Sequence, residues 1–412
     1  MDSKKHNSRI PQLRFPSFEG EWEEKSFGEL YKKNNIKNDL SFGVDKIISV
    51  ANMYFKTDAN VGDEEYLRSY NVFHLGDIAY EGNKSANYAY GRFVENTIGD
   101  GIVSHVFDVY TPISKNHCLG YWKYAINYER IMRPVLEKST IKSTMMTNLI
   151  AKDFLKQKTF VPSPAEQQKI AECLEAEDRM ISAQEQKVES LKAHKKGLMQ
   201  QLFPQPGVTT PELRFPGFTG EWQEKKLNEV FSRVTRKNAE NNQNVLTISA
   251  QYGLISQLEF FKKSVAAADV SGYYLLHKGD FAYNKSSSQG RPVGAIKPLK
   301  LYDKGVVSTL YICFRCKNPK EIDFWEQYFD AGLLDKELMS VAQEGARNHG
   351  LLNIPTSGFF ELSVITPSPE EQQKIASCLS SLDIIIQAEI DKLESLKAHK
   401  KGLMQQLFPF YK

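Results

Sequence analysis

The stretch ESLKAHKKGLMQQLFP stands at residues 189–204 and again, without a change, at residues 394–409. The likeness extends outward, because 162–204 and 367–409 share 31 of 43 residues. A second block recurs upstream: PQLRFPSFEGEWEEKSFGEL at 11–30 and PELRFPGFTGEWQEKKLNEV at 211–230 share 12 of 20 residues. Two copies with a period of about 200 residues indicate a domain duplication and not a solenoid of short repeats.

Each copy of the longer block predicts one long helix. Ser163 and Ser368 suit the N-cap, a proline follows each of them, and acidic residues such as Glu166 lie in the first turn, where the helix dipole favours negative charge. The helical pattern then continues without proline to Pro204 or Pro409. That length is about 40 residues, or roughly 60 Å.

The apolar residues of each predicted helix recur with a period of 3.5, which is the spacing of a heptad seam. Glu177, Gln184 and Lys195 interrupt the first seam, and Glu389 and Lys400 interrupt the second. The seams are Ile170, Leu174, Ile181, Val188, Leu191, Leu198, Leu202 and Ile375, Leu379, Leu382, Ile386, Leu393, Leu396, Leu403, Leu407. Each helix could lie on its own domain, or the two helices could pack on each other. We expect the second arrangement, because such a helix is longer than a domain of about 150 residues.

The order of the blocks along the chain predicts the direction of the helices. The first helix leads through QPGVTT (205–210) directly into the 211–230 block. By the same local rule, the end of the second helix should lie beside residues 11–18. The helices must then be antiparallel, with an approximate two-fold axis between two modules. The expected domains are a first module at 1–161, a helix at 162–204, a second module at 205–366 and a helix at 367–412.

Between the repeated blocks lie two modules, about 22–160 and 222–365, that resemble each other only faintly. HLGDIAY at 74–80 matches HKGDFAY at 277–283, and GIVSHVFDVY at 101–110 matches GVVSTLYICF at 305–314. Short β-branched and aromatic runs separated by Gly, Asn, Asp and Ser indicate strands and loops with a few helices. We therefore expect an α+β protein: two mixed α/β modules of one fold, joined by two long helices that form an antiparallel coiled coil.

Polar loops at matched positions of the two modules are candidates for DNA contact. Lys, Arg, Asn, Gln and Ser side chains suit both phosphate contacts and hydrogen bonds to base edges, although most such loops are simply solvated. The candidates of the first module are Lys84, Ser85, Asn87, Tyr88, Tyr90, Arg92, Lys142 and Ser143. Those of the second module are Lys285, Ser286, Ser287, Gln289, Arg291, Arg347, Asn348 and His349.

The composition permits DNA binding but does not argue for it, because the formal net charge is only +3. No run of about 18 apolar residues is present, so no membrane span is expected. The first residues, MDSKKHNSRIPQ, do not form a signal peptide, and a cytoplasmic location is expected.

No motif of catalysis or metal binding stands out in the sequence. Cys313 and Cys316 have CxxC spacing but lie in a strand-like run with no second pair, which argues against a metal site. The chain has neither a GxxxxGK[ST] phosphate loop nor the cofactor and catalytic motifs of a DNA methyltransferase. No nuclease signature is convincing. We expect a protein that is not an enzyme on its own.

Over its whole length the chain resembles the specificity (S) subunit of bacterial type I restriction-modification enzymes. The features that carry the resemblance are the two variable modules, PSPxEQQKIAxCL at the start of each helix, LKAHKKGLMQQLFP at its end, and LRFPxFxGEW before each module. The resemblance implies that the modules are target recognition domains, each reading one half of a bipartite, asymmetric site in double-stranded DNA. It also implies that the helices set the gap between the halves.

The same resemblance implies partners and cofactors. Two methyltransferase (M) subunits would dock on the helices and methylate adenine with S-adenosylmethionine. Restriction (R) subunits would join through them and use ATP and Mg2+ to translocate and cleave unmodified DNA, such as that of phage. This chain itself would hold no cofactor and no metal. The candidates for contact with the M subunits are Gln167, Gln168, Lys192, His194, Lys195, Gln372, Gln373, Lys397, His399 and Lys400.

A different class of protein also fits the pattern. A coiled-coil scaffold or adaptor could pair two proteins through the duplicated helices without touching DNA. Methylation of specific DNA sequences that depends on this chain separates the two hypotheses.

Overall fold

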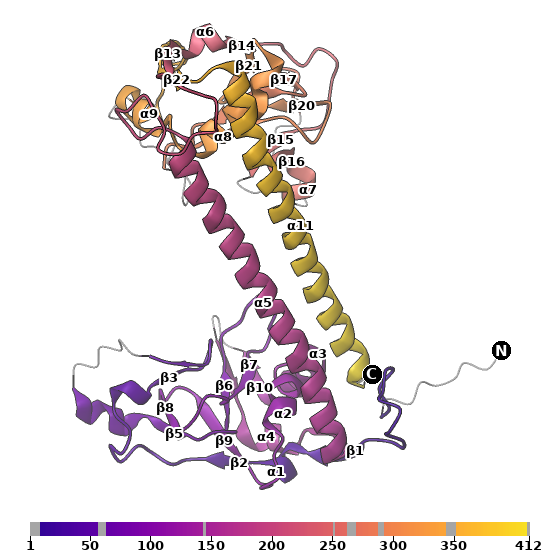
Figure 1. The fold of residues 1–412 in the computed structure, drawn as a ribbon. Coiled ribbons are helices and arrows are strands. Elements are labelled where there is room, and N and C mark those ends of the chain that lie inside the picture. The colour runs from indigo at the N-terminus through magenta and orange to yellow at the C-terminus, as the bar shows by residue number, and fades with distance from the viewer. Residues whose placement is uncertain are drawn as a thin grey trace, which may run out of the picture. The chain divides into compact units, whose positions relative to one another are not determined.

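The structure is a computed structural model that describes residues 9–56, 63–142, 146–249, 252–261, 269–286, 292–342 and 352–409 (Figure 1). It divides into two units. Unit 1 holds the described residues up to Glu185 and those from Lys392 onward, and unit 2 holds Gln186–Asp391. The long helices α5 (Pro164–Leu202) and α11 (Pro369–Leu407) therefore each contribute their first part to one unit and their last part to the other.

The centre of unit 1 is a four-stranded antiparallel sheet in the order β2-β9-β6-β7. Smaller antiparallel pairs, β1-β12, β3-β4, β5-β8 and β10-β11, surround it. The strands are β1 Glu23–Ser26, β2 Tyr31–Asn34, β3 Ile48–Ser49, β4 Tyr54–Phe55, β5 Asn71–Phe73, β6 Ile78–Glu81, β7 Arg92–Glu95, β8 Gly101–Val103, β9 Asp108–Pro112, β10 Thr140–Lys142, β11 Thr147–Leu149 and β12 Lys158–Val161. The short helices are α1 Phe27–Leu30, α2 Leu119–Ala125, α3 Glu129–Ser139 and α4 Ala151–Lys156.

Unit 2 repeats the central sheet, in the order β14-β21-β18-β19, and three of the smaller pairs, as β13-β22, β15-β16 and β17-β20; its described residues contain no counterpart of β10-β11. Its strands are β13 Gln223–Lys226, β14 Phe231–Arg233, β15 Leu246–Ser249, β16 Gly253–Ser256, β17 Tyr274–His277, β18 Asp280–Asn284, β19 Ala295–Pro298, β20 Lys304–Val307, β21 Ile312–Cys316 and β22 Ser363–Thr366. Its short helices are α6 Leu227–Val230, α7 Gln257–Phe261, α8 Ile322–Asp330, α9 Asp335–Val341 and α10 Thr356–Phe360. The prediction that both modules share one fold is confirmed.

Aromatic side chains fill the core between each central sheet and its helices. In unit 1 the ring of Phe93 on β7 stacks on Phe154 of α4, with 4.5 Å between centroids. In unit 2 Phe281 of β18 stacks on Phe314 of β21 at 5.4 Å. Large buried rings contribute strongly to the hydrophobic free energy of folding. This core fixes the strand ends from which the loops of each module project.

Each long helix begins as the sequence predicts. The backbone N–H of Glu166 donates to the Ser163 hydroxyl at 3.3 Å, and that of Glu371 donates to Ser368 at 3.4 Å. Both carboxylates are buried and receive two hydrogen bonds from an arginine of the upstream block. Arg14 binds Glu166 at 2.8 Å through Nε and Nη2, and Arg214 binds Glu371 at 2.7 Å in the same way. The upstream block is therefore tied to the start of the helix by a bidentate ion pair.

The ends of the helices lie against the same upstream blocks. The backbone N–H of Leu213 donates to the Gln201 carbonyl at 2.9 Å in unit 2, and that of Leu13 donates to the Gln406 carbonyl at 3.0 Å in unit 1. The second bond confirms that the end of the second helix lies beside residues 11–18. Each unit thus contains the start of one long helix and the end of the other.

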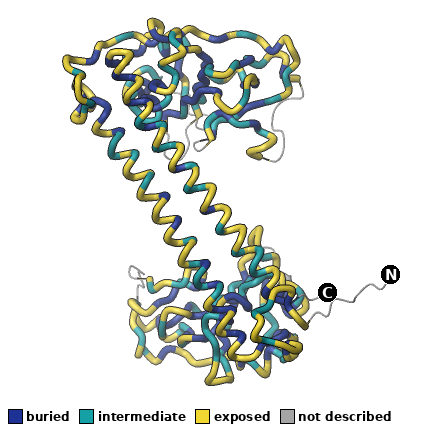
Figure 2. The backbone as a smooth tube through the Cα atoms, turned by 45° about the vertical axis from the view of Figure 1, so that its right-hand side comes forward, coloured by how far each residue is buried: buried dark blue, intermediate teal, exposed yellow. Residues whose placement is uncertain are grey.

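Within each unit the two helix segments pack through the predicted seam, and each seam residue is buried or half-buried (Figure 2). The interrupting lysines are paired across it. Lys400 binds Asp178 in unit 1, and Lys195 binds Asp383 at 2.5 Å in unit 2. Because these pairs join the start of one helix to the end of the other, the helices run antiparallel. The expected fold class, α+β with two mixed modules and an antiparallel helix pair, is confirmed.

Each of these aspartates also contacts a helix of its own module. The Tyr124 hydroxyl of α2 donates to Asp178 at 2.5 Å, and the Gln327 amide of α8 donates to Asp383 at 2.7 Å. Burial alone would raise the pKa of Asp178, but the bonds from Lys400 and Tyr124 hold it below its ordinary value. The aspartates therefore anchor each module to the helix pair.

Among the described residues, no helix combines the length and the apolar character needed to cross a membrane.

Candidate nucleic-acid interface

The start of the loop that follows β6 in unit 1 is hydrogen-bonded to the hairpin β10-β11. The Thr147 N–H and hydroxyl both donate to the Gly82 carbonyl, at 2.9 and 3.0 Å, and the Tyr80 hydroxyl lies 2.6 Å from the Thr147 hydroxyl. A side chain at Gly82 would place its Cβ only 2.2 Å from the Thr147 carbonyl oxygen, so this close approach requires glycine.

This packing brings together the two candidate stretches of the first module. Asn83 forms an isolated β-bridge with Met146, at the end of the β10-β11 hairpin. Lys142 lies in β10, where only its backbone is described, and Ser143 lies outside the described residues. Stretches about 60 residues apart in sequence thus form one surface, as adjacent hairpins of an antiparallel fold can.

The tip of this loop is exposed, whereas side chains at its base form hydrogen bonds with the rest of the module. Residues 83–87 are exposed, and this tip includes the candidates Lys84, Ser85 and Asn87. The Tyr88 hydroxyl donates to the Asn127 side chain at 2.5 Å, and buried Tyr90 donates to Glu137 at 2.7 Å. Tyr88 and Tyr90 therefore hold the base of the loop.

Arg92, another candidate, is engaged within the module. Its Nε donates to Glu81 at 2.7 Å, and its guanidinium lies over the Tyr88 ring, 5.2 Å from the centroid. Such a pair with a stacked ring holds the planar guanidinium in place. In the described structure the exposed tip is more accessible to a large partner than Arg92.

In unit 2 the start of the loop after β18 is also held by a contact from a distant part of the chain. The Leu352 N–H donates to the Lys285 carbonyl at 3.1 Å, so Leu352 lies beside the start of the loop after β18. The Tyr283 hydroxyl donates to the Val293 carbonyl at 2.6 Å, as Tyr80 donates to the Tyr90 carbonyl in unit 1. Ser286 is exposed, and burial lowers the pKa of Lys285. The candidates outside the described residues are Ser287, Gln289, Arg291, Arg347, Asn348 and His349.

Four of the candidates for contact with a partner subunit have roles inside the units. The Gln167 and Gln372 side chains are buried and donate to the Pro162 and Pro367 carbonyls, at 3.0 and 3.1 Å, which closes the first turn of each helix. Lys195 and Lys400 form the seam ion pairs described above. Because the four side chains already make these contacts, they are less available to a partner subunit than the sequence indicates.

The other partner candidates lie on exposed faces of the helices. Three of them pair with a carboxylate: Lys192 with Glu189 at 2.9 Å, Lys397 with Glu185 at 3.0 Å and His399 with the largely buried Glu177 at 3.3 Å. Surface ion pairs of this kind contribute little to stability, so a partner can replace them. The remaining exposed candidates are Gln168, His194 and Gln373.

A polar pair that the sequence analysis did not single out lies at the end of β7 in unit 1. The Glu95 carboxyl is buried, and its Oε1 lies 2.6 Å from Nε2 of His117. Burial raises the pKa of Glu95 to about 9 and lowers that of His117 to about 4. Between these values the pair holds one proton and carries no net charge.

We expect the stability of unit 1 to fall as the pH rises from about 6.5 to 9. In this window an unfolded glutamate is charged and an unfolded histidine is neutral, so unfolding releases the Glu95 proton and high pH favours it. The loss is about 2 kcal/mol between pH 7 and 8.5. Urea unfolding at the two pH values measures it. Glu95→Gln, which stays neutral, should remove most of this difference; an equal pH dependence in the variant would contradict the assignment.

Among the described residues, no group of three or more His, Cys, Asp or Glu side chains is placed to hold a metal ion.

Comparison with known proteins supports a specific family. Residues 219–398, which span most of unit 2, match the family described as the type I restriction modification DNA specificity domain. A comparison with curated protein sequences gave no significant match.

Solved structures share the fold over nearly the whole chain. The S subunit of a type I restriction-modification system from M. genitalium is 15% identical, with 98% of this chain and 100% of that chain covered and a TM-score of 0.56. A chain from a study of complex assembly and conformational transition of the type I R-M system is 14% identical, with 94% and 97% covered and a TM-score of 0.53. Residues 219–398 therefore belong to the type I restriction modification DNA specificity domain family, and the solved S subunit shares the fold of the whole chain, including its repeat in unit 1.

Proposed function

We propose that this chain is the DNA-recognition subunit of a type I restriction-modification complex. Each module reads one half of a bipartite, asymmetric site in double-stranded DNA, and the helices set the gap between the halves. The chain is not catalytic: adenine methylation with S-adenosylmethionine belongs to two M subunits, and ATP- and Mg2+-dependent restriction belongs to R subunits.

The observation that carries this proposal is that a repeated frame presents unlike loops at equivalent places. Both units share the order of strands, the arginine–glutamate pair at the helix start and the lysine–aspartate pair across the seam. The loops after β6 and β18 differ in sequence, yet each is bonded at its start to a segment far away in the chain, at Thr147 in unit 1 and at Leu352 in unit 2. Unlike polar side chains on like scaffolds suit the reading of two different base sequences.

The proposed roles within the first module follow from exposure. Lys84 suits a phosphate contact, and Asn87 suits a pair of hydrogen bonds to an adenine edge in the major groove. Tyr88, Tyr90 and Arg92 would hold the loop in shape while the tip reads. A loop that is held in shape before binding loses less conformational entropy when it meets DNA.

Docking of two identical M subunits would explain the repeated 16 residues. Packing accounts for the identity of seam positions such as Leu198 and Leu403. It does not account for the exposed positions, which are also identical in both copies: Glu189, Ser190, Lys192, Ala193, His194, Lys196, Gln200, Gln201 and their equivalents in α11. We propose that this exposed face of each helix end contacts an M subunit, together with Gln168 and Gln373 near the helix starts.

If the length of the helices sets the gap between the two half-sites, one heptad inserted into both helices will lengthen that gap. The matched insertion points are after Glu185 in α5 and after Ile390 in α11. Seven residues add about 10 Å to a helix, which corresponds to about three base pairs at most. Sequencing of methylated sites in a host that expresses the variant with its M subunits gives the new spacing.

The matched control inserts the heptad into one helix only. It shifts the seam and separates Lys195 from Asp383 or Lys400 from Asp178, so we expect loss of methylation. Unchanged spacing in the double insertion, with methylation retained, would show that the helices do not set the gap.

A further inference from the structure

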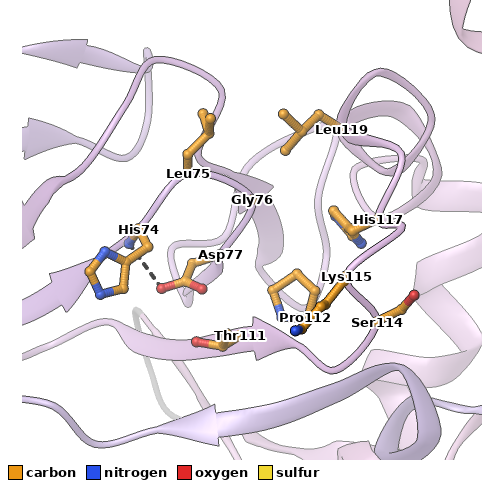
Figure 3. Close-up of a pocket in the computed structure, with 10 residues that line it drawn as sticks. All are labelled: His74, Leu75, Gly76, Asp77, Thr111, Pro112, Ser114, Lys115, His117 and Leu119. Atoms are coloured by element: carbon orange, nitrogen blue, oxygen red, sulfur yellow. Dashed lines mark hydrogen bonds between the residues drawn. The ribbon is translucent and has the colours of Figure 1, made fainter.

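A pocket of about 280 Å³ lies in unit 1 between the turn before β6 and the segment after β9 (Figure 3). It is lined by His74, Leu75, Gly76, Asp77, Thr111, Pro112, Ser114, Lys115, His117 and Leu119. The Asp77 side chain is 1% exposed, and its Oδ1 has no hydrogen-bond partner. Buried polar atoms are nearly always paired, so this oxygen needs an explanation.

The equivalent aspartate of unit 2 shows what an occupied site looks like. Oδ2 of Asp280 accepts the His277 N–H at 2.8 Å and Nη2 of Arg236 at 2.9 Å, while Oδ1 accepts Nε of Arg315 at 2.6 Å. Its carboxylate is fully buried between two guanidinium groups. Here the chain itself supplies the positive charge that a buried carboxylate needs.

In unit 1 the same framework has no guanidinium group on the aspartate. Oδ2 of Asp77 accepts the His74 N–H at 3.0 Å and the Asn34 amide at 3.2 Å, which matches the arrangement around Oδ2 of Asp280. Since Ile78 pairs with Tyr110 and Phe281 with Phe314, the residue in the place of Arg315 is Thr111. The Thr111 hydroxyl is near enough to Asp77 to lower its pKa, but threonine is too short and uncharged to replace a guanidinium, and it lines the pocket.

Burial raises the pKa of Asp77, and the nearby Thr111 hydroxyl, His74 and the Asn34 amide offset this only in part. A bound cation would reverse that effect and pair the oxygen that has no partner. In Figure 3 the His74 backbone bond is on one side of the carboxylate, and the other side faces Pro112 and Lys115. Lys115 is exposed and makes no recorded bond to Asp77, so the chain does not fill the site as it does in unit 2.

We propose that this pocket of unit 1 is a guanidinium site, and that it receives an arginine side chain of a partner protein. The two arginines on Asp280 identify the ligand chemistry: a planar fork of donors that a carboxylate accepts. Because unit 2 fills its own site, the pocket distinguishes two units that are otherwise alike, and only one arginine is taken per chain.

The position of the pocket favours a protein partner over DNA. It lies at the start of β6, whereas the proposed reading loop follows the end of that strand. Next to Leu119, which lines the pocket, the Cys118 thiol donates to Gln168 of α5 at 3.7 Å. The pocket therefore borders the helix face on which an M subunit is proposed to dock; the identity of the partner, but not the site itself, rests on the proposed function.

The first test uses the full chain alone and a small probe, arginine with both termini blocked. Side-chain resonances of ¹⁵N-labelled His74 and His117 should shift and saturate as the probe is added. The blocked citrulline, which has nearly the same shape but no charge, should bind at least about tenfold more weakly. No saturable shift, or equal binding of citrulline, would overturn the proposal. Failure here leaves the proposed DNA recognition untouched, because neither DNA nor a partner is present.

Three variants sharpen this test. Thr111→Arg places in unit 1 the arginine that unit 2 has, and Asp77→Asn removes the charge with little change of shape; each should abolish binding of the probe. Lys115→Ala should bind as tightly as the parent or more tightly, since a like charge is removed. Binding that survives in Asp77→Asn, or is lost in Lys115→Ala, would contradict the assignment.

A second test identifies the source of the arginine. Thr111→Arg should weaken assembly with the M subunit about tenfold, whereas the matched change Thr247→Arg on β15 of unit 2, away from the pocket, should not. Assembly that is equal in parent and Thr111→Arg would overturn the partner assignment.

Discussion

Replacing residues 31–157 with the corresponding module of a known type I restriction-modification S subunit will change one half of the recognised DNA sequence. The other half and the gap will stay as they were, because the exchanged segment contains the reading loop but neither long helix. The borders follow the structure: β2 begins at Tyr31, and β12, which pairs with β1, begins at Lys158. The Arg14–Glu166 pair therefore remains in place.

The methylated motif, read by sequencing in a host with the M subunits, measures this change. Exchange of the equivalent residues 231–362 is the matched control and should change the opposite half only. A changed gap with both halves retained would contradict the division of labour between modules and helices.

Arg14→Ala will destabilise unit 1 by about 3 kcal/mol, because it leaves the buried Glu166 carboxylate without its charged partner. Arg214→Ala will destabilise unit 2 by a larger amount. Glu166 keeps a hydrogen bond from the Trp22 indole at 3.2 Å, whereas the indole nitrogen of Trp222 has no partner. Urea unfolding of each variant measures the two losses.

The control for this prediction removes the charge that is left behind. Glu166→Gln in the Arg14→Ala background should regain part of the lost stability, since a buried neutral amide costs less than a buried charge. If Arg14→Ala alone were within about 0.5 kcal/mol of the parent, as a surface substitution is, the pair would not hold the upstream block on the helix.

The repeated sequence was sufficient to predict the helices, their antiparallel direction and the place of residues 11–18 beside the second helix. These follow from local rules: a serine cap, a heptad period and a short linker. In sequence Lys195 and Lys400 interrupt the apolar seam, and the structure pairs them with Asp383 and Asp178. A pairing across two helices depends on register, which a single sequence does not specify.

The candidate site could be predicted only in part. The position of the loop after β6 follows from the repeated GDxAY pattern, but its contact with Met146 and Thr147 joins residues far apart in the chain. The sequence does not show which side chains hold the loop in shape and which are exposed. The predicted DNA contacts therefore include Tyr90 and Arg92 as well as Lys84 and Asn87. The Asp77 pocket was likewise hidden, although the repeat itself offered a signal: both copies have HxGD, and only the second copy has an arginine, Arg315, on the neighbouring strand.

The central claim is that this chain directs methylation to a specific bipartite DNA sequence. Sequencing of methylated adenines in a host that contains the M subunits, with and without the chain, tests it most directly. The account predicts one asymmetric, two-part motif that is methylated only when the chain is present. The same methylation pattern in both hosts would contradict recognition of DNA by this protein and favour a scaffold that only pairs other proteins.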